Sequence, residues 1–128
     1  MDAQAAVDEL ALLSTQVVEA VVVAGDDVAG ATTTGDRAAE LALVGRELLQ
    51  AAGGVTADGA GVERVEISLD SGGVLVVRDG ERLIVATTVP DATPGLVLYD
   101  LRTALRRSAL PERKRPPRRR ARREQRDA

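Results

Sequence analysis

Several residue groups in this sequence are of types that carry out chemistry in proteins. Two pairs of adjacent carboxylates, Asp8 with Glu9 and Asp26 with Asp27, could in principle divide acid and base roles. Four hydroxyls are potential nucleophiles: Ser14, Ser68, Ser71 and Ser108. The sequence has no histidine and no cysteine, so no imidazole can activate a serine and no thiolate can bind a metal ion. The carboxylate pairs fall in turns or on a helix flank, where we expect them to be solvated. We therefore predict that the chain is not an enzyme and has no catalytic residues.

Two further stretches could bind an anion. Residues 53–61, GGVTADGAG, are rich in glycine but lack the GK[ST] ending of a phosphate-binding loop and do not lead from a strand into a helix. Residues 32–36, TTTGD, place hydroxyls before a helix N-terminus, where capping explains them better than anion binding does. We expect no cofactor, no metal ion and no small-molecule substrate.

The elements that would position these residues follow from hydrophobic spacing and turn signals. Amphipathic spacing predicts helices over 3–14 and 36–52, and a last helix with Thr93 as N-cap and Pro94 at its first position. β-Branched and alternating runs predict five strands, near 18–24, 28–33, 62–69, 74–78 and 82–88, with a flexible loop over 56–62. The fold class is therefore α+β: a five-stranded antiparallel sheet with helices on both faces, in the order α-β-β-α-β-β-β-α.

The long second helix has two apolar stripes, which implies two partners for it. One stripe consists of Leu41, Val44, Leu48 and Ala52, and the adjacent one of Ala38, Ala42, Gly45 and Leu49. Gly45 costs about 1 kcal/mol relative to alanine within a helix. Either close packing against another backbone offsets this cost, or the glycine is simply tolerated.

Composition narrows the choices further. Apolar residues make up 45% of the chain but include a single aromatic, so the core must be built from Val, Leu, Ile and Ala. No apolar run approaches the roughly 20 residues that span a bilayer, and the first ten residues are acidic rather than basic. The expected location is the cytoplasm.

Charge divides the chain into two parts, a domain over residues 1–110 and a tail over 111–128. The tail has nine basic and three acidic residues, so its net charge is +6 and that of the remainder is −9. Its three prolines and its lack of apolar residues larger than alanine predict disorder. It could contact nucleic acid, an anionic membrane or an acidic protein, or serve only solubility. The expected electrostatic contacts are Arg113, Lys114, Arg115, Arg118, Arg119, Arg120, Arg122 and Arg123.

Together, the element order and two stretches resemble the roadblock/dynein light chain family. AVDELALLSTQVVEAVVVAGDDVAGATT, residues 6–33, is similar to the opening helix and first hairpin of that family, and DATPGLVLYDLRTALRR, residues 91–107, to its entry into the last helix. The resemblance implies a homodimer in which the third strands pair antiparallel and the second helices pack side by side. The implied dimer interface consists of Ala38, Ala42, Gly45, Leu49, Val65, Ile67 and Leu69. The alternative is a monomer whose third strand is protected by its own charges at Glu63, Arg64 and Glu66.

The resemblance also implies a function. Bacterial roadblock proteins commonly act beside a small Ras-like GTPase, so we expect a non-catalytic homodimeric scaffold or regulator that binds such a GTPase or a signalling complex containing one. The alternative is a dimeric adaptor that binds nucleic acid or an anionic membrane through residues 111–128. The partner's identity, and whether GTPase activity is stimulated, inhibited or only scaffolded, stay open at the level of sequence.

Overall fold

The computed structural model describes residues 1–55 and 63–109. The predicted loop at 56–62 and the predicted tail at 111–128 lie outside the described residues. Within them the elements are α1 (Ala3–Leu13), β1 (Val17–Ala24), β2 (Asp27–Ala31), α2 (Gly35–Gly53), β3 (Arg64–Leu69), β4 (Gly72–Asp79), β5 (Arg82–Thr88) and α3 (Pro94–Ser108). The predicted element order is confirmed.

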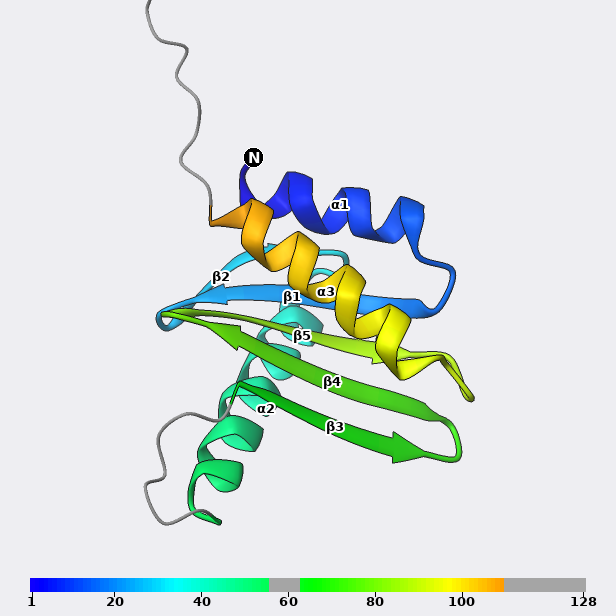
Figure 1. Cartoon of the computed structure of the whole chain (residues 1–128). Coiled ribbons are helices and arrows are strands. Elements are labelled where there is room, and N and C mark those ends of the chain that lie inside the picture. The colour runs from blue at the N-terminus through cyan, green and yellow to red at the C-terminus, as the bar shows by residue number, and fades with distance from the viewer. Residues whose placement is uncertain (56–62, 110–128) are drawn as a thin grey trace, which may run out of the picture.

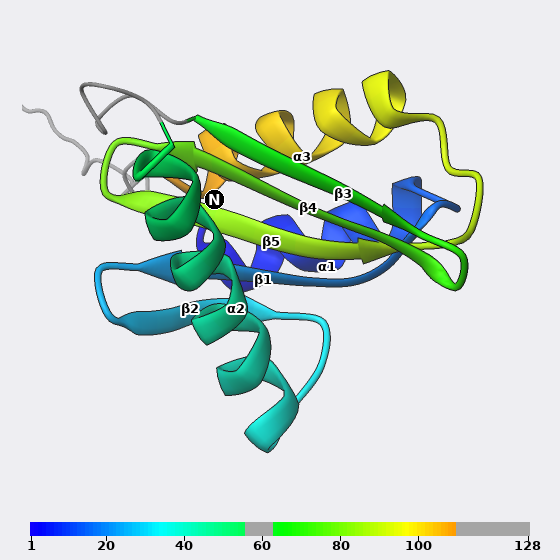
Figure 2. The ribbon, with the colours of Figure 1, turned by 90° about the horizontal axis from the view of Figure 1, so that it is seen from below.

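The five strands form one sheet in the order β2-β1-β5-β4-β3, and all neighbouring strands are antiparallel. Helices α1 and α3 lie side by side on one face of the sheet, while α2 crosses the other face (Figures 1 and 2). The predicted α+β class, with helices on both faces, is therefore correct. Within the described residues, the edge strands of the sheet are β2 and β3.

Alternating side chains build a core on each face of the sheet. In β1, Ala20 and Val22 pack beneath α1 and α3, whereas Val21 and Val23 pack against α2. β5 repeats the pattern, with Ile84 on the α1 and α3 face. A strand covered on both faces needs apolar residues at every position, which explains the continuous valine run of β1.

The helices begin close to the predicted positions, but only α1 has an N-cap side chain that makes a capping hydrogen bond. Asp2 caps α1 by accepting a hydrogen bond from the Ala5 amide at 2.7 Å, and Pro94 begins α3. Thr34 and Thr93 occupy the N-cap positions of α2 and α3 but make no side-chain capping bond. The capping interpretation of TTTGD is therefore wrong for its side chains. The Thr32 hydroxyl instead accepts the Ala20 amide of β1 at 2.9 Å, just beyond the end of β2, where the Thr32 amide also donates to the Ala20 carbonyl at 2.9 Å.

Two glycines set the turns beside β4. Gly80 lies in the β4–β5 turn with a φ of 64°, the left-handed region that glycine enters without strain. Asp-Gly is a common sequence for a type I′ turn, in which both residues have positive φ, but Asp79 does not have a positive φ here, so that pair is not formed. Gly72, which begins β4, has a φ of 146°, and a Cβ built there would lie 2.3 Å from the Thr88 carbonyl oxygen. The β3–β4 connection therefore depends on the absence of a side chain at Gly72.

Candidate interaction surface

The edge of the sheet at β2 is closed by α1. The Gln4 side chain accepts the Ala31 amide through Oε1 at 3.0 Å and donates to the Ala31 carbonyl through Nε2 at 2.8 Å. Nε2 also donates to Asp8, which holds the amide in place. Beside it, the Gly30 backbone lies so close to Ala3 that a Cβ would be 2.6 Å from the α1 backbone. At Ala31 the side chain of Gln4 thus makes the two backbone hydrogen bonds that a neighbouring strand would make.

The edge at β3 is open among the described residues. The Arg78 amide donates to the Glu63 carbonyl at 2.7 Å, which fixes the phase of the β3–β4 ladder. Because an antiparallel strand bonds its neighbour at every second residue, Val65, Ile67 and Leu69 point their backbone groups toward β4. The amides and carbonyls of Arg64, Glu66 and Ser68 consequently point outward. Unpaired groups of this kind are a template for another strand.

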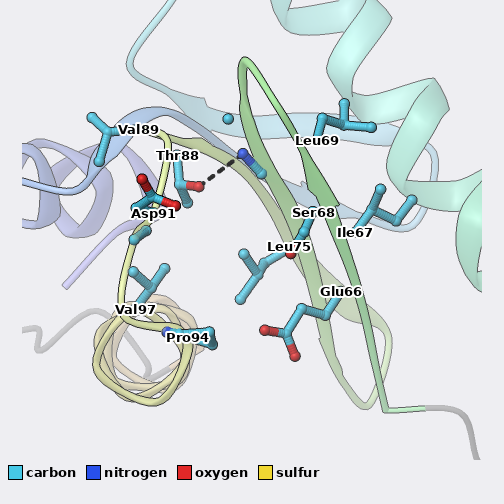
Figure 3. A pocket seen from close by; sticks show the side chains of 13 residues that line it. Glu66, Ile67, Ser68, Leu69, Leu75, Thr88, Val89, Asp91, Pro94 and Val97 are labelled. Atoms are coloured by element: carbon cyan, nitrogen blue, oxygen red, sulfur yellow. Dashed lines mark hydrogen bonds between the residues drawn. The ribbon is translucent and has the colours of Figure 1, made fainter.

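Apolar side chains line this open edge on the face that carries α2. Ile67 pairs with Val74 and Val65 with Val76, and Leu69 is 57% exposed at the end of the strand. The view along α3 shows Ile67 and Leu69 on one side of β3 and Glu66 on the other (Figure 3). Helix α2 crosses the sheet obliquely and leaves the far ends of β3 and β4 uncovered (Figure 2).

The structure places the predicted interface residues of α2 elsewhere. Ala38, Ala42, Gly45 and Leu49 are buried against the sheet of their own chain. A Cβ at Gly45 would lie 3.1 Å from the Cβ of Val85, so the small residues bring α2 close to β5. In this structure these four residues are not available to a second copy, which corrects that part of the predicted interface. The neighbouring stripe is less covered: Leu48 is half-buried and, like Val65 and Val74, packs against the margin of the core beneath α2.

An ion-pair network fastens the start of α2 to the sheet. Arg37 donates to both carboxylate oxygens of Glu19 at 2.8 Å, to Glu40 at 2.7 Å, and Thr87 donates to Glu19 at 3.0 Å. The hydrogen bond from Arg37 is the main reason that the pKa of Glu19 is lowered from its ordinary 4.5, against a smaller opposing effect of burial. The pKa of Arg37 is raised by the same contact.

We expect Glu19→Gln to reduce the free energy of unfolding at about pH 7 by roughly 0.5–1 kcal/mol, since the bond is charge-assisted but Arg37 is half exposed. A carboxyl group whose pKa is lowered by folding stabilises the fold above its unfolded pKa and loses that contribution as the pH falls through the folded value. The difference between the two proteins should therefore shrink below pH 4.5. Urea unfolding at several pH values measures it. Glu40→Gln, at an exposed pair one turn along α2, is the control and should change little. A difference independent of pH would contradict the assignment.

The opposite face of β3 borders a hollow of about 210 Å³ between that strand and the start of α3 (Figure 3). Glu66 and Ser68 line it from β3, Pro94 and Val97 from α3, and Thr88 from the end of β5. The Thr88 hydroxyl accepts the Gly73 amide at 3.0 Å, so it is already used within the fold. The carboxylates of Glu66 and Asp91 line the same hollow as Ser68. The hollow borders the open edge strand β3 on the face opposite α2.

The remaining predicted site residues and groups can be placed briefly. Arg113 and the other seven basic tail residues of the predicted electrostatic contact lie outside the described residues. Within residues 1–55 and 63–109, no cluster of acidic side chains could hold a metal ion. No helix in the same two ranges is long and apolar enough to cross a membrane.

Comparison with known proteins gives a consistent result for the fold alone. No protein-family model matches the chain, and no curated protein matches it. Among solved structures, the crystal structure of a Roadblock/LC7 domain from Streptomyces avermitilis superposes with a TM-score of 0.72 at 19% identity, covering 84% of this chain and 94% of that one. A second Roadblock/LC7 domain structure from Streptomyces gives a TM-score of 0.66 at 19% identity, covering 81% of this chain and 95% of that one. The chain therefore has the fold of a Roadblock/LC7 domain.

Proposed function

We propose that the chain is a non-catalytic homodimeric scaffold that binds and regulates a small Ras-like GTPase, or a signalling complex containing one. The observation that carries the dimer is the contrast between the two sheet edges. Gln4 closes β2, while β3 presents three outward residues and an apolar flank. A second copy that pairs with β3 would join the two sheets into one and remove the exposed edge from both chains.

The phase of β3 restricts how two copies can pair. The outward residues of one strand must face outward residues of the other. Two antiparallel β3 strands would be related by a two-fold axis that passes through one residue of each. If that residue were Glu66, two like charges would lie opposite each other, which destabilises a sheet. An axis through Ile67 sets Glu66 opposite Ser68, and on the other face sets Val65 opposite Leu69 and Ile67 opposite its own mate. We favour this register because all three pairs on the α2 face are then apolar.

We expect Ile67→Cys to form an intermolecular disulfide in a chain that has no cysteine of its own. On the axis, residue 67 and its mate form a non-hydrogen-bonded pair with Cα atoms about 4.5 Å apart, within the range of a disulfide. Val65→Cys and Leu69→Cys are the matched controls, because each would lie about four residues, or roughly 13 Å, from its mate. A non-reducing gel reads the result.

Cross-linking of Val65→Cys instead of Ile67→Cys would show that the two-fold axis of the dimer passes through residue 65, two residues from the proposed position. Absence of cross-linking at every position from 64 to 69, in a protein that retains its circular dichroism spectrum, would exclude β3 from the interface.

The GTPase part of the proposal is supported by the roadblock resemblance and by the fold. Affinity capture with the full chain and with residues 1–110 should retain the same GTPase. The purified GTPase, loaded with GDP or with a non-hydrolysable GTP analogue, then shows which nucleotide state is bound, and its hydrolysis rate with and without the protein shows the direction of regulation. If no GTPase is retained by either form, this part of the proposal fails while the dimer is unaffected.

The second candidate function is adaptor binding through the tail, which the net charge of +6 over residues 111–128 favours. Two tails in one dimer would raise the avidity for an anionic polymer or surface through effective concentration. Removing these residues, or raising the salt concentration, should then abolish binding to DNA, RNA or anionic vesicles. Binding that survives both treatments would contradict it.

A further inference from the structure

The single aromatic side chain of this protein lies on the surface. Tyr99 of α3 is 68% exposed, and Leu12 and Leu13, at the end of α1, are 86% and 74% exposed. Leu96 is also exposed, one turn before Tyr99 on α3. Exposed large apolar residues that gather in one place mark interaction sites, and tyrosine is enriched in such sites. Leu13 and Tyr99 form a patch together on the sheet face opposite α2, whereas Leu96 stands between Pro94 and Val97, which border the hollow beside β3.

A groove runs between the two helices at this patch. Helices α1 and α3 lie side by side and antiparallel (Figure 1), and the groove has a volume of about 140 Å³. Leu10 and Leu13 line it from α1, and Tyr99 and Thr103 from α3. A water molecule occupies about 30 Å³ in the liquid, so the groove has the volume of several water molecules. A space of that size can take one large apolar side chain.

The walls of the groove determine the conformation of its occupant. The side chains of α1 and α3 form both walls, and the backbone groups within these helices are already paired along each helix. An occupant finds no backbone partner on these walls, which favours a segment that pairs its own amides and carbonyls. An α-helix does this, and its side-chain ridges fit the groove between two packed helices.

The charge of the rim determines the chemistry of the occupant. Glu9 and Asp100 line the groove together with Arg107, and Arg107 is already paired with Glu9. Asp100 has no ion pair or side-chain hydrogen bond with any other described residue. Because Glu9 and Arg107 balance each other, the lining carries one unbalanced negative charge, which favours lysine or arginine beside the apolar stripe of an incoming helix.

We propose that the α1–α3 groove binds a basic amphipathic helix of a partner protein, with a leucine-sized anchor between Leu13 and Tyr99. The tail of this chain is basic, but residues 111–128 contain no apolar residue larger than alanine apart from three prolines, so they cannot supply the anchor. A second copy docked groove to groove would set the acidic rims against each other. A separate basic helix meets both the apolar and the charge requirement.

Fluorotyrosine labelling gives a direct test, because one tyrosine yields one ¹⁹F signal. The probe is a synthetic helical peptide of leucine and lysine with the lysines on one face, titrated into the full-length protein. The control peptide has the same leucine pattern with glutamate in place of lysine. We expect the leucine and lysine peptide to shift the Tyr99 signal saturably, and the glutamate peptide to bind at least tenfold more weakly.

Variants separate groove binding from general attraction to an acidic domain. Leu13→Gln should weaken the lysine peptide at least tenfold, whereas Leu43→Gln, at an exposed leucine of α2 on the other face of the sheet, should leave the affinity unchanged. Equal effects of the two substitutions, equal binding of the two peptides, or no shift at millimolar peptide would each overturn the proposal. Because the groove is remote from β3, a monomeric variant should bind the peptide as well as the parent does, so this test is independent of the dimer.

Discussion

Replacing Glu66 with proline is expected to convert the proposed dimer into a folded monomer. The Glu66 amide points away from β4, so proline removes no hydrogen bond from the sheet of its own chain. The same amide would donate to the second copy, and the proline ring would occupy the position of the incoming strand. Proline also favours extended backbone at the preceding Val65, which is already in a strand. Light scattering at micromolar concentration should give a mass of 13.4 kDa instead of twice that value.

The control for this prediction is Glu66→Thr, which removes the charge but keeps the amide. It should remain dimeric, so that the loss of the N–H rather than of the carboxylate explains the effect of proline. Ile67→Pro should behave differently from both, because it removes a bond to β4 and destabilises the chain itself. A Glu66→Pro protein that is still dimeric would place the interface elsewhere. A parent protein that is monomeric at micromolar concentration would end the dimer proposal directly.

The second large effect is expected at Gly72, where alanine should lower the free energy of unfolding by about 2–4 kcal/mol. Its φ of 146° is in a region that side chains strongly disfavour, and the added Cβ would lie 2.3 Å from the Thr88 carbonyl oxygen. To relieve this steric clash, β4 would have to move away from the end of β5, and β3 would move with it. Urea unfolding followed by circular dichroism measures the loss.

Gly95→Ala provides the matched control in the same chain. A Cβ at Gly95 meets no atom within 4 Å, and its φ is not in the left-handed region. Alanine in the first turn of α3 should be neutral or stabilising by about 0.4–1 kcal/mol. If Gly72→Ala and Gly95→Ala have the same stability, the close approach at Gly72 is not a constraint on this fold.

The element order was predictable from sequence because each signal is local. The valine runs, the Gly-Asp and Asp-Gly turns and the proline that opens α3 each act within a few residues. The strand order and the exposed position of β3 agree with the resemblance as well. Local signals and the resemblance together therefore lead from the amino-acid sequence to the Roadblock/LC7 fold.

The contact made by the small-residue stripe of α2 was not predictable in the same way. A surface of Ala42 and Gly45 permits close approach by a helix or by a sheet, and the sequence does not distinguish the two. The structure resolves this by placing β5 against Gly45. The exposed patch at Tyr99 was also missed, because its signal depends on which side of α3 faces α1. The one available hint was compositional: a core of aliphatic residues does not require the single aromatic.

Gln4 has a consequence for the size of any assembly that this protein forms. A folded unit with two free sheet edges resembles a bifunctional monomer in polymer chemistry, since each addition leaves another reactive end and growth continues into a filament. One glutamine amide, bonded to both backbone groups of Ala31, occupies the end of β2 and leaves β3 as the open end of the unit. In the proposed dimer, addition of a second unit at β3 would use that end, so growth would terminate at two.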